Sequence, residues 1–232
     1  MRFKDVFSII GPDMVGPSSS HTAGALRIGR IARHLFGEQP ERAEIALFQS
    51  FADTGRGHGT DAAIAAGLLG WQTDDLRIPQ ARVYAEELGL SLRFRTGRGM
   101  APHPNTAQLH LSAGGRSLSL IGTSVGGGNV EIVNVDGFDV RFGAAYPTMA
   151  VWHRDRVGLL ADLTRLFSRY RLNIGFMDVD RSRRSGDALT VIETDAEVPA
   201  GLAAAVRRVS GVARAVAFDV SGRSGPDEHC DA

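Results

Sequence analysis

The sequence predicts an α+β protein made of an N-terminal α/β domain over residues 1–144 and a C-terminal ferredoxin-like βαββαβ domain over residues 146–220. Two observations carry this prediction. In the first part, polar loops rich in glycine or proline alternate with single helical or strand-like runs. In the second part, the patterns follow the order β-α-β-β-α-β. The Gly/Ser/Asp-rich tail, residues 221–232, is expected to be disordered.

The first predicted element is an amphipathic helix over residues 22–36. Its apolar residues fall on one helical stripe, namely Ile28, Ile31, Ala32 and Leu35. The loop at its start holds Ser18, Ser19, Ser20, His21 and Thr22. Because a helix N-terminus presents unpaired N–H groups and a positive dipole end, we expect this loop to hold a carboxylate or phosphate. The alternative is that Ser20 or Thr22 is only a helix cap.

Shorter elements fill the rest of the first part. Alternating apolar residues predict strands over residues 43–51, 90–95, 107–112, 117–121 and 129–135. Helices are predicted over 62–69 and 79–88. Thr60 or Asp61 is expected to cap the first of these two helices.

The second part contains four predicted strands and two predicted helices. The strands cover residues 148–153, 172–180, 188–193 and 212–220, and the helices cover 157–170 and 199–209. The apolar side of the first helix is expected to hold Leu159, Leu160, Leu163, Leu166 and Phe167. Pro199 suits the first turn of the second helix.

A second polar loop, residues 53–61, places one imidazole among closely spaced glycines. The segment Gly55-Arg56-Gly57-His58-Gly59 lacks both the P-loop and the dinucleotide-loop spacing, so a nucleotide is not expected there. Glycines let the backbone approach a ligand, and an imidazole is the usual group for moving a proton at neutral pH. We therefore interpret His58 as a proton-transfer residue, with a structural histidine as the alternative.

A third polar loop carries His103, Asn105 and Thr106 in front of a predicted strand. Loops of this kind on a rigid scaffold usually build a binding site, although a rigid turn with an exposed ring is the alternative for His103. Gly126-Gly127-Gly128 is interpreted as a flexible turn, or else as a backbone-amide ligand site. Arg27, Arg30 and Arg33 recur every third residue, which favours a solvated helix face or, second, a subunit contact.

Composition excludes several classes of function. The 26 basic and 26 acidic residues balance, so no overall charge favours nucleic acid or an acidic membrane surface. No apolar run approaches a membrane span and no signal peptide is seen, so a cytoplasmic protein is expected. The single cysteine, Cys230, excludes a disulfide framework or an iron–sulfur cluster held by this chain alone. The seven histidines show no metal-binding spacing, so we predict no metal site in this chain.

Taken together, the motifs resemble a known family. The segments Gly16–Thr22, Thr54–Asp61, His103–Thr106 and Gly122–Gly128 are similar in order and spacing to the β subunit of iron–sulfur-dependent L-serine dehydratase. The C-terminal part resembles an ACT domain, with His153–Leu160 as its first strand-to-helix turn. The resemblance covers roughly residues 3–220.

The resemblance implies a function for the chain. The enzyme family, L-serine ammonia-lyases, converts L-serine to pyruvate and ammonia in serine degradation and gluconeogenesis. A [4Fe–4S] cluster on a partner α subunit acts as Lewis acid on the serine hydroxyl, and the β chain, similar to the allosteric substrate-binding domain of some phosphoglycerate dehydrogenases, closes over that site. A stand-alone amino-acid-binding regulatory module is the alternative.

The resemblance also implies roles for individual residues. His58 becomes the catalytic residue, and the expected substrate-binding residues are Ser18, Ser19, Ser20, His21, Thr22, His103, Asn105 and Thr106. An ACT site for a small amino acid or for subunit pairing is expected at Asp155, Gly158, Leu159, Asn173 and Ile174. A hetero-oligomer paired through ACT domains follows, and Cys230 is interpreted as an incidental thiol.

Overall fold

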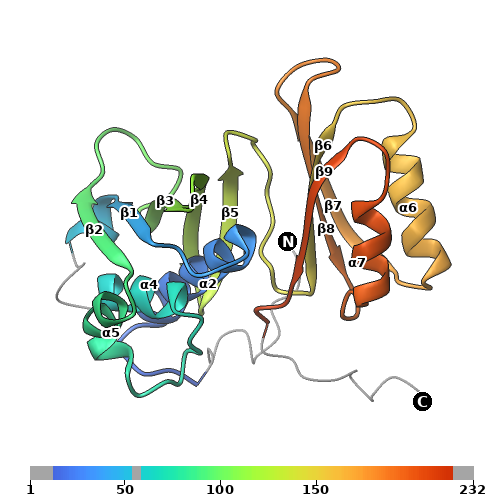
Figure 1. Cartoon of the computed structure of the whole chain (residues 1–232). Coiled ribbons are helices and arrows are strands. Elements are labelled where there is room, and N and C mark those ends of the chain that lie inside the picture. Colours follow the sequence, from blue (N-terminus) through green and yellow to red (C-terminus); the bar gives the residue numbers. More distant parts are fainter. Residues whose placement is uncertain (1–12, 54–58, 222–232) are drawn as a thin grey trace, which may run out of the picture. The chain divides into compact units, whose positions relative to one another are not determined.

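The computed structural model describes residues 13–53 and 59–221 and divides into two compact units, Met1–Gly143 and Ala144–Ala232 (Figure 1). Each unit combines one sheet with helices, which confirms the predicted α+β fold class. The predicted disorder of the tail concerns residues that, from 222 onward, lie outside the described part of the chain.

The first unit contains a five-stranded sheet and a set of mostly short helices. Its described elements are η1 (Ser19–Gly24), α2 (Ala25–Phe36), β1 (Arg42–Leu47), α3 (Gln49–Asp53), α4 (Thr60–Leu68), η2 (Ile78–Gln80), α5 (Ala81–Glu87), β2 (Ser91–Thr96), β3 (Thr106–Ala113), β4 (Arg116–Gly126) and β5 (Asn129–Val135). The strand order is β2-β1-β3-β4-β5, with β1 and β2 parallel and the other pairs antiparallel. Helices α2, α4 and α5 lie on one side of this sheet (Figure 1).

Helices α2 and α4 cross in backbone contact. A Cβ on Gly67 would lie 2.1 Å from the carbonyl oxygen of Leu26, and a Cβ on Gly29 would lie 2.5 Å from that of Ile64. Protein interiors are packed as densely as organic crystals, so even one methyl group has no room at this crossing. The two glycines therefore set the separation of the helices that support the hydroxyl-rich loop.

Two predictions for the first unit were wrong in detail. The strand predicted over 43–51 ends at Leu47, because Gln49 takes a positive φ of 42° and begins helix α3. Helix α4 is capped by neither Thr60 nor Asp61. Its N-cap is Gly59 in the left-handed conformation, and the Asp61 carboxylate accepts from the N–H of Ala62 instead.

The arginines of α2 do not form a solvated face. Arg30 is only 7% exposed and donates to Gln72 Oε1 at 2.7 Å. Arg33 donates to the carbonyl oxygen of Leu68, and burial lowers the pKa of its guanidinium. Arg27 donates to the carbonyl oxygen of Gly128 at 3.1 Å, which ties the triple-glycine turn to the helix. The solvated-face interpretation is therefore wrong, since a 3-residue spacing of long side chains also suits packing between elements.

The second unit has the predicted βαββαβ order. Its elements are β6 (Thr148–Arg154), α6 (Leu159–Arg169), β7 (Ile174–Arg181), β8 (Asp187–Thr194), α7 (Ala200–Arg207) and β9 (Val212–Phe218). The sheet order is β7-β8-β6-β9 and every neighbouring pair is antiparallel. Both helices pack on one face of the sheet (Figure 1), where Leu163, Phe167 and Leu202 belong to the buried core. Leu160, expected on the apolar side of α6, is 37% exposed, and Pro199 is the N-cap of α7.

Candidate functional site

The hydroxyl-rich loop forms the start of a long helical segment. Residues Ser19–Gly24 make a π-helix, η1, which runs directly into α2. Ser18 is the N-cap, and its Oγ accepts from the N–H of His21 at 3.2 Å. The alternative that Ser20 or Thr22 is only a helix cap is therefore wrong, because both residues lie inside the first turns. Ser19 and Ser20 are half-buried at the helix start, where N–H groups lack intrahelical partners.

Hydroxyl groups hold the His21 ring on both sides. Its Nδ1 lies 3.1 Å from Ser18 Oγ, and its Nε2 lies 3.1 Å from Ser50 Oγ of α3. The ring also contacts Phe51, with ring centroids 5.7 Å apart. Because both ring nitrogens have partners, the geometry suits a residue that fixes the loop rather than one that moves a proton.

The third polar loop is a tight turn held by its own side chains. The Thr106 hydroxyl donates to the carbonyl oxygen of His103 at 2.6 Å, and the N–H of Asn105 donates to His103 Nδ1 at 3.1 Å. A neutral imidazole that accepts at Nδ1 carries its proton at Nε2. His103 is therefore fixed as a donor through Nε2. Its ring is half-buried, so the residue can stabilise the turn through Nδ1 and still contact a ligand through Nε2.

The hydroxyl-rich loop, the third loop and the end of β4 come together. The N–H of Ser124 donates to the carbonyl oxygen of Asn105 at 2.9 Å. A Cβ on Gly24 would lie 2.1 Å from Ser124 Oγ, so η1 approaches β4 closely at this residue. Thr22, which is 2% exposed, lies two residues before Gly24 on the same π-helix.

Three buried oxygen atoms in this cluster have no hydrogen-bond partner among the described residues. They are Thr22 Oγ1, Asn105 Oδ1 and Ser124 Oγ. Buried polar groups in folded proteins are nearly always paired, and an unpaired group calls for a ligand, a water or an ion. Three such atoms in contacting segments make this cluster the candidate binding site of the first unit.

In the second unit, a cavity of about 280 Å³ lies at the turn between β6 and α6. Asp155, Gly158 and Leu159 line it, together with residues of β7 and β8. Asn173 and Ile174 lie elsewhere, because Ile174 pairs with Thr194 at the end of β7 opposite to Arg181. Within one chain, the structure therefore brings together three of the five residues expected there and leaves two apart.

Known protein families match both units of the chain. Residues 3–91 match the family model of the serine dehydratase beta chain, and residues 148–211 match the ACT domain. The chain is 44% identical over 198 residues to the probable L-serine dehydratase beta chain of Bacillus subtilis (strain 168), covering 85% of this chain and 90% of that protein. The chain belongs to the L-serine dehydratase β-chain family.

Two further relatives of this β chain define the extent of the similarity. The L-serine dehydratase beta chain of Peptoniphilus asaccharolyticus is 34% identical over 86% of this chain and 91% of its own length. The D-3-phosphoglycerate dehydrogenase of Synechocystis sp. is 24% identical over 87% of this chain but only 36% of its own length. In the described residues, no helix is long and apolar enough to cross a membrane.

Two residues of the β-chain site were missed by sequence reasoning. Ser50 falls within a segment interpreted as strand, and only its place in α3 directs it to His21. Ser124 belongs to the Gly122–Gly128 motif, which was interpreted only through its glycines, as a turn or a backbone-amide site. The motif itself was the available signal. His58 lies outside the described residues, but the elements on either side of its loop, α3 and α4, both contact the hydroxyl-rich segment.

In the ACT domain, the Asp155 carboxylate already has partners. It accepts from the N–H of Ser185 at 3.0 Å and from Arg181 at 2.9 Å. These two contacts hold the pKa of Asp155 below its usual value, the backbone N–H being the larger cause. The carboxylate thus joins the β6–α6 turn to the β7–β8 turn, so a ligand in the cavity would meet an ordered rim.

The lowered pKa of Asp155 predicts an acid-sensitive contribution to stability. Because the folded-state pKa is below the unfolded value of about 3.9, the contribution is complete above that value and disappears as pH falls through the folded pKa. We expect Asp155→Asn to lower the Tm slightly at pH 6 and to lower it less at pH 3. Thermal unfolding of both proteins at the two pH values measures this; a difference that grows on acidification would contradict it.

Proposed function

We propose that this β chain binds L-serine and, together with a partner α subunit, converts it to pyruvate and ammonia. The observation that supports the proposal most strongly is the cluster of unpaired buried oxygens on Thr22, Asn105 and Ser124. Thr22 and Asn105 lie in the loops that the family resemblance assigns to the substrate, and Ser124 lies in the Gly122–Gly128 motif that carries the same resemblance. The two relatives named L-serine dehydratase beta chain, from Bacillus subtilis and Peptoniphilus asaccharolyticus, support the same substrate.

The chemistry of the cluster matches the groups of a serine zwitterion. The amide oxygen of Asn105 can only accept, which suits the ammonium group, whereas the hydroxyls of Thr22 and Ser124 can donate to a carboxylate. The N–H groups at the start of η1 favour the same carboxylate. In this proposal Ser18 and His21 fix the loop, and His103 adds a donor at Nε2.

In this scheme His58 removes the α-proton of the bound serine. The reaction needs a base within hydrogen-bond reach of that carbon, and an imidazole is suited to this at neutral pH. His21 has both ring nitrogens engaged, and His103 is fixed as a donor, so neither competes for the role.

The donor atoms of this chain do not fit a [4Fe–4S] cluster. Such a cluster needs about three or four thiolates, and this chain has one cysteine. We therefore propose that any cluster is held by the α subunit and that the β chain contributes substrate contacts only. Pairing through the ACT domain, a cytoplasmic location and a role in gluconeogenesis belong to the same proposal.

The deciding experiment is to purify the chain with its α partner under anaerobic, iron-loaded conditions and to measure pyruvate from L-serine. We expect activity from the pair and none from the β chain alone. A pair that binds iron but forms no pyruvate would overturn the proposal.

A serine-to-alanine pair tests the substrate contact. Ser124→Ala removes one of the three unpaired oxygens, and we expect KM for L-serine to rise about 10- to 100-fold, the effect of losing a hydrogen bond to a charged group. Ser117→Ala, an exposed position on the same strand β4, is the matched control and should leave KM unchanged. Equal KM values for the two variants would remove Ser124 from the site.

A second candidate is an amino-acid sensor without catalysis. It is favoured by the D-3-phosphoglycerate dehydrogenase relative, in which a region similar to most of this chain forms only part of a different enzyme. Calorimetry distinguishes the two: serine binding to the isolated chain, combined with an inactive α–β pair, is the result expected of a sensor.

A further inference from the structure

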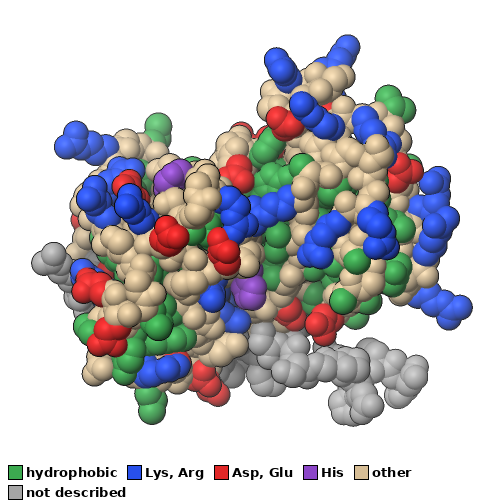
Figure 2. Space-filling view, in the orientation of Figure 1, with side chains coloured by type: hydrophobic (Ala, Val, Ile, Leu, Met, Phe, Trp, Pro, Cys, Tyr) green, Lys and Arg blue, Asp and Glu red, His purple; other side chains and the backbone are tan. Residues whose placement is uncertain are grey.

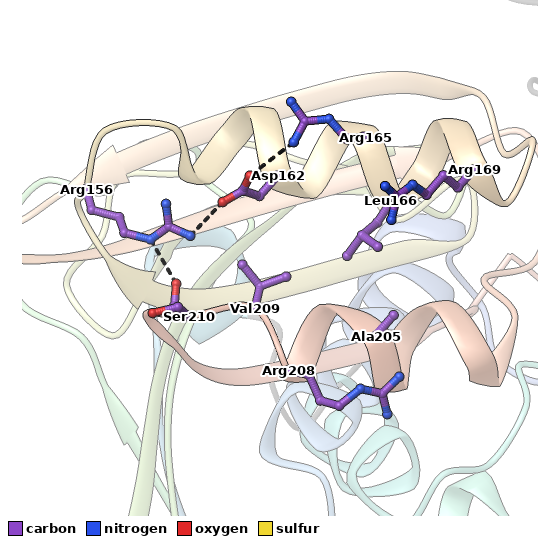
Figure 3. A pocket seen from close by; sticks show the side chains of 9 residues that line it. All are labelled: Arg156, Asp162, Arg165, Leu166, Arg169, Ala205, Arg208, Val209 and Ser210. Carbon is purple, nitrogen blue, oxygen red and sulfur yellow. Dashed lines mark hydrogen bonds and ion pairs between the residues drawn. The ribbon is translucent and has the colours of Figure 1, made fainter.

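We propose that the groove between α6 and α7 of the ACT domain binds a compact dianion, such as a phosphate group or a short dicarboxylate. This groove shares Arg156 with the cavity beside Asp155, and its other lining residues differ. It is about 300 Å³ in volume and is lined by residues of both helices and of the segments that flank them (Figure 3). A hollow of this size suits a small metabolite.

The lining of the groove is strongly basic. Four arginines and one aspartate line it, namely Arg156, Arg165, Arg169, Arg208 and Asp162. The whole chain carries equal numbers of basic and acidic residues, so this excess is local. In Figure 2 several basic side chains gather over α6 and α7. Guanidinium groups match phosphate and carboxylate oxygens by paired hydrogen bonds, which points to an anionic ligand.

The one carboxylate of the groove is already neutralised. Asp162 accepts from Arg156 at 2.7 Å through one oxygen and from Arg165 at 3.3 Å through the other. The Nε of Arg156 also donates to the carbonyl oxygen of Ser210, which fixes this guanidinium at one end of the groove (Figure 3). Asp162 therefore organises the basic lining and does not offset the two other arginines.

Arg169 and Arg208 are the groups available to a ligand. Both side chains are exposed, and neither forms a hydrogen bond or ion pair with another described residue. Both line the groove, Arg169 from the end of α6 and Arg208 from the end of α7 (Figure 3). Two guanidinium groups that line one groove without a carboxylate partner repel one another, and a dianion bound in that groove relieves the repulsion.

The floor of the groove suits a small carbon skeleton. Leu166, Ala205 and Val209 supply apolar surface between the charged ends. Binding sites for small molecules commonly combine such a surface with a few convergent polar groups. An isolated surface arginine would lack this floor, and an arginine that only complements a helix C-terminus would not require a partner on the other helix.

The test is calorimetric titration of the full-length chain with inorganic phosphate and, separately, with succinate, each against sodium chloride at equal ionic strength. We expect saturable one-to-one binding of at least one anion with a Kd of about 1 mM or tighter. The two titrations distinguish a phosphate-bearing ligand from a dicarboxylate. The double variant Arg169→Gln/Arg208→Gln should bind at least about tenfold more weakly, since two charged hydrogen-bonding groups are lost.

Arg184→Gln, which removes the same charge from an exposed turn of the same domain, is the matched control and should bind like the wild type. The variant Arg169→Lys/Arg208→Lys should retain part of the affinity, because lysine keeps the charge but not the paired hydrogen-bond geometry. Should the double Gln variant fail to fold, each single variant is measured and should lose at least threefold. The proposal is overturned by the absence of saturable binding, by binding that no groove variant weakens, or by an equal loss in Arg184→Gln.

Discussion

Replacing His58 with Asn is expected to lower kcat of the α–β pair for L-serine by about 10²- to 10⁴-fold, with a much smaller change in KM. Loss of a general base removes an interaction that acts mainly in the transition state, so turnover suffers more than binding. Pyruvate formation over a range of serine concentrations measures both constants.

The matched control for this substitution is His110→Asn. His110 is exposed on β3 and is interpreted as structural, so its replacement should leave kcat within about twofold. A mild effect of His58→Asn would return that residue to its structural alternative. The proposed contact between Ser124 and L-serine would not be affected, because the KM of Ser124→Ala tests it independently.

Gly67→Ala is expected to reduce the free energy of unfolding by about 3 kcal/mol, because the added methyl group meets backbone atoms of α2. The new Cβ would lie 2.1 Å from the carbonyl oxygen of Leu26 and 2.8 Å from the backbone nitrogen of Arg30. Backbone cannot rotate away as a side-chain tip can, so the two helices must separate. Denaturant unfolding followed by circular dichroism measures the change.

The same substitution at Gly201 provides the comparison. Gly201 lies exposed in α7, and its Cβ would meet only the end of the flexible Tyr170 side chain, 3.0 Å away. There the higher helix propensity of alanine should stabilise the chain by up to about 1 kcal/mol. A Gly67→Ala variant that loses no stability, as expected of Gly201→Ala, would show that the α2–α4 crossing tolerates a methyl group.

Much of the fold could be predicted from local patterns. The stripe of Ile28, Ile31 and Leu35 predicted α2, and alternation predicted most strands of both sheets. The errors arose where a single backbone angle decides the outcome. Gln49 interrupts a strand-like pattern with a positive φ, and Gly59 takes the cap position from Thr60, whose hydroxyl is buried.

The candidate site was less predictable than the fold. Residue type indicated that the loop of Ser18 and His21 and the loop of Asn105 carry chemistry, but not which atoms already have partners. That Ser50 binds His21 and that Ser124 binds Asn105 depends on contacts between segments far apart in the chain. The sequence could not show either contact, because the first follows from how α3 packs against η1 and the second from the pairing of β3 with β4.

The π-helical start of the hydroxyl-rich segment has a consequence for how insertions and deletions act on this family. A π-helical turn holds one residue more than an α-helical turn, which is the product expected of a one-residue insertion. Each residue turns an α-helix by about 100°, so the extra one rotates Ser18, Ser19 and Ser20 by that angle relative to the buried stripe of α2. Deletion of Gly24 from η1 would keep every hydroxyl and every core residue of the segment, yet it would rotate the hydroxyl-rich loop relative to the buried stripe of α2. A related chain with a one-residue gap in this segment can therefore keep the serines of the loop without keeping their orientation relative to α2.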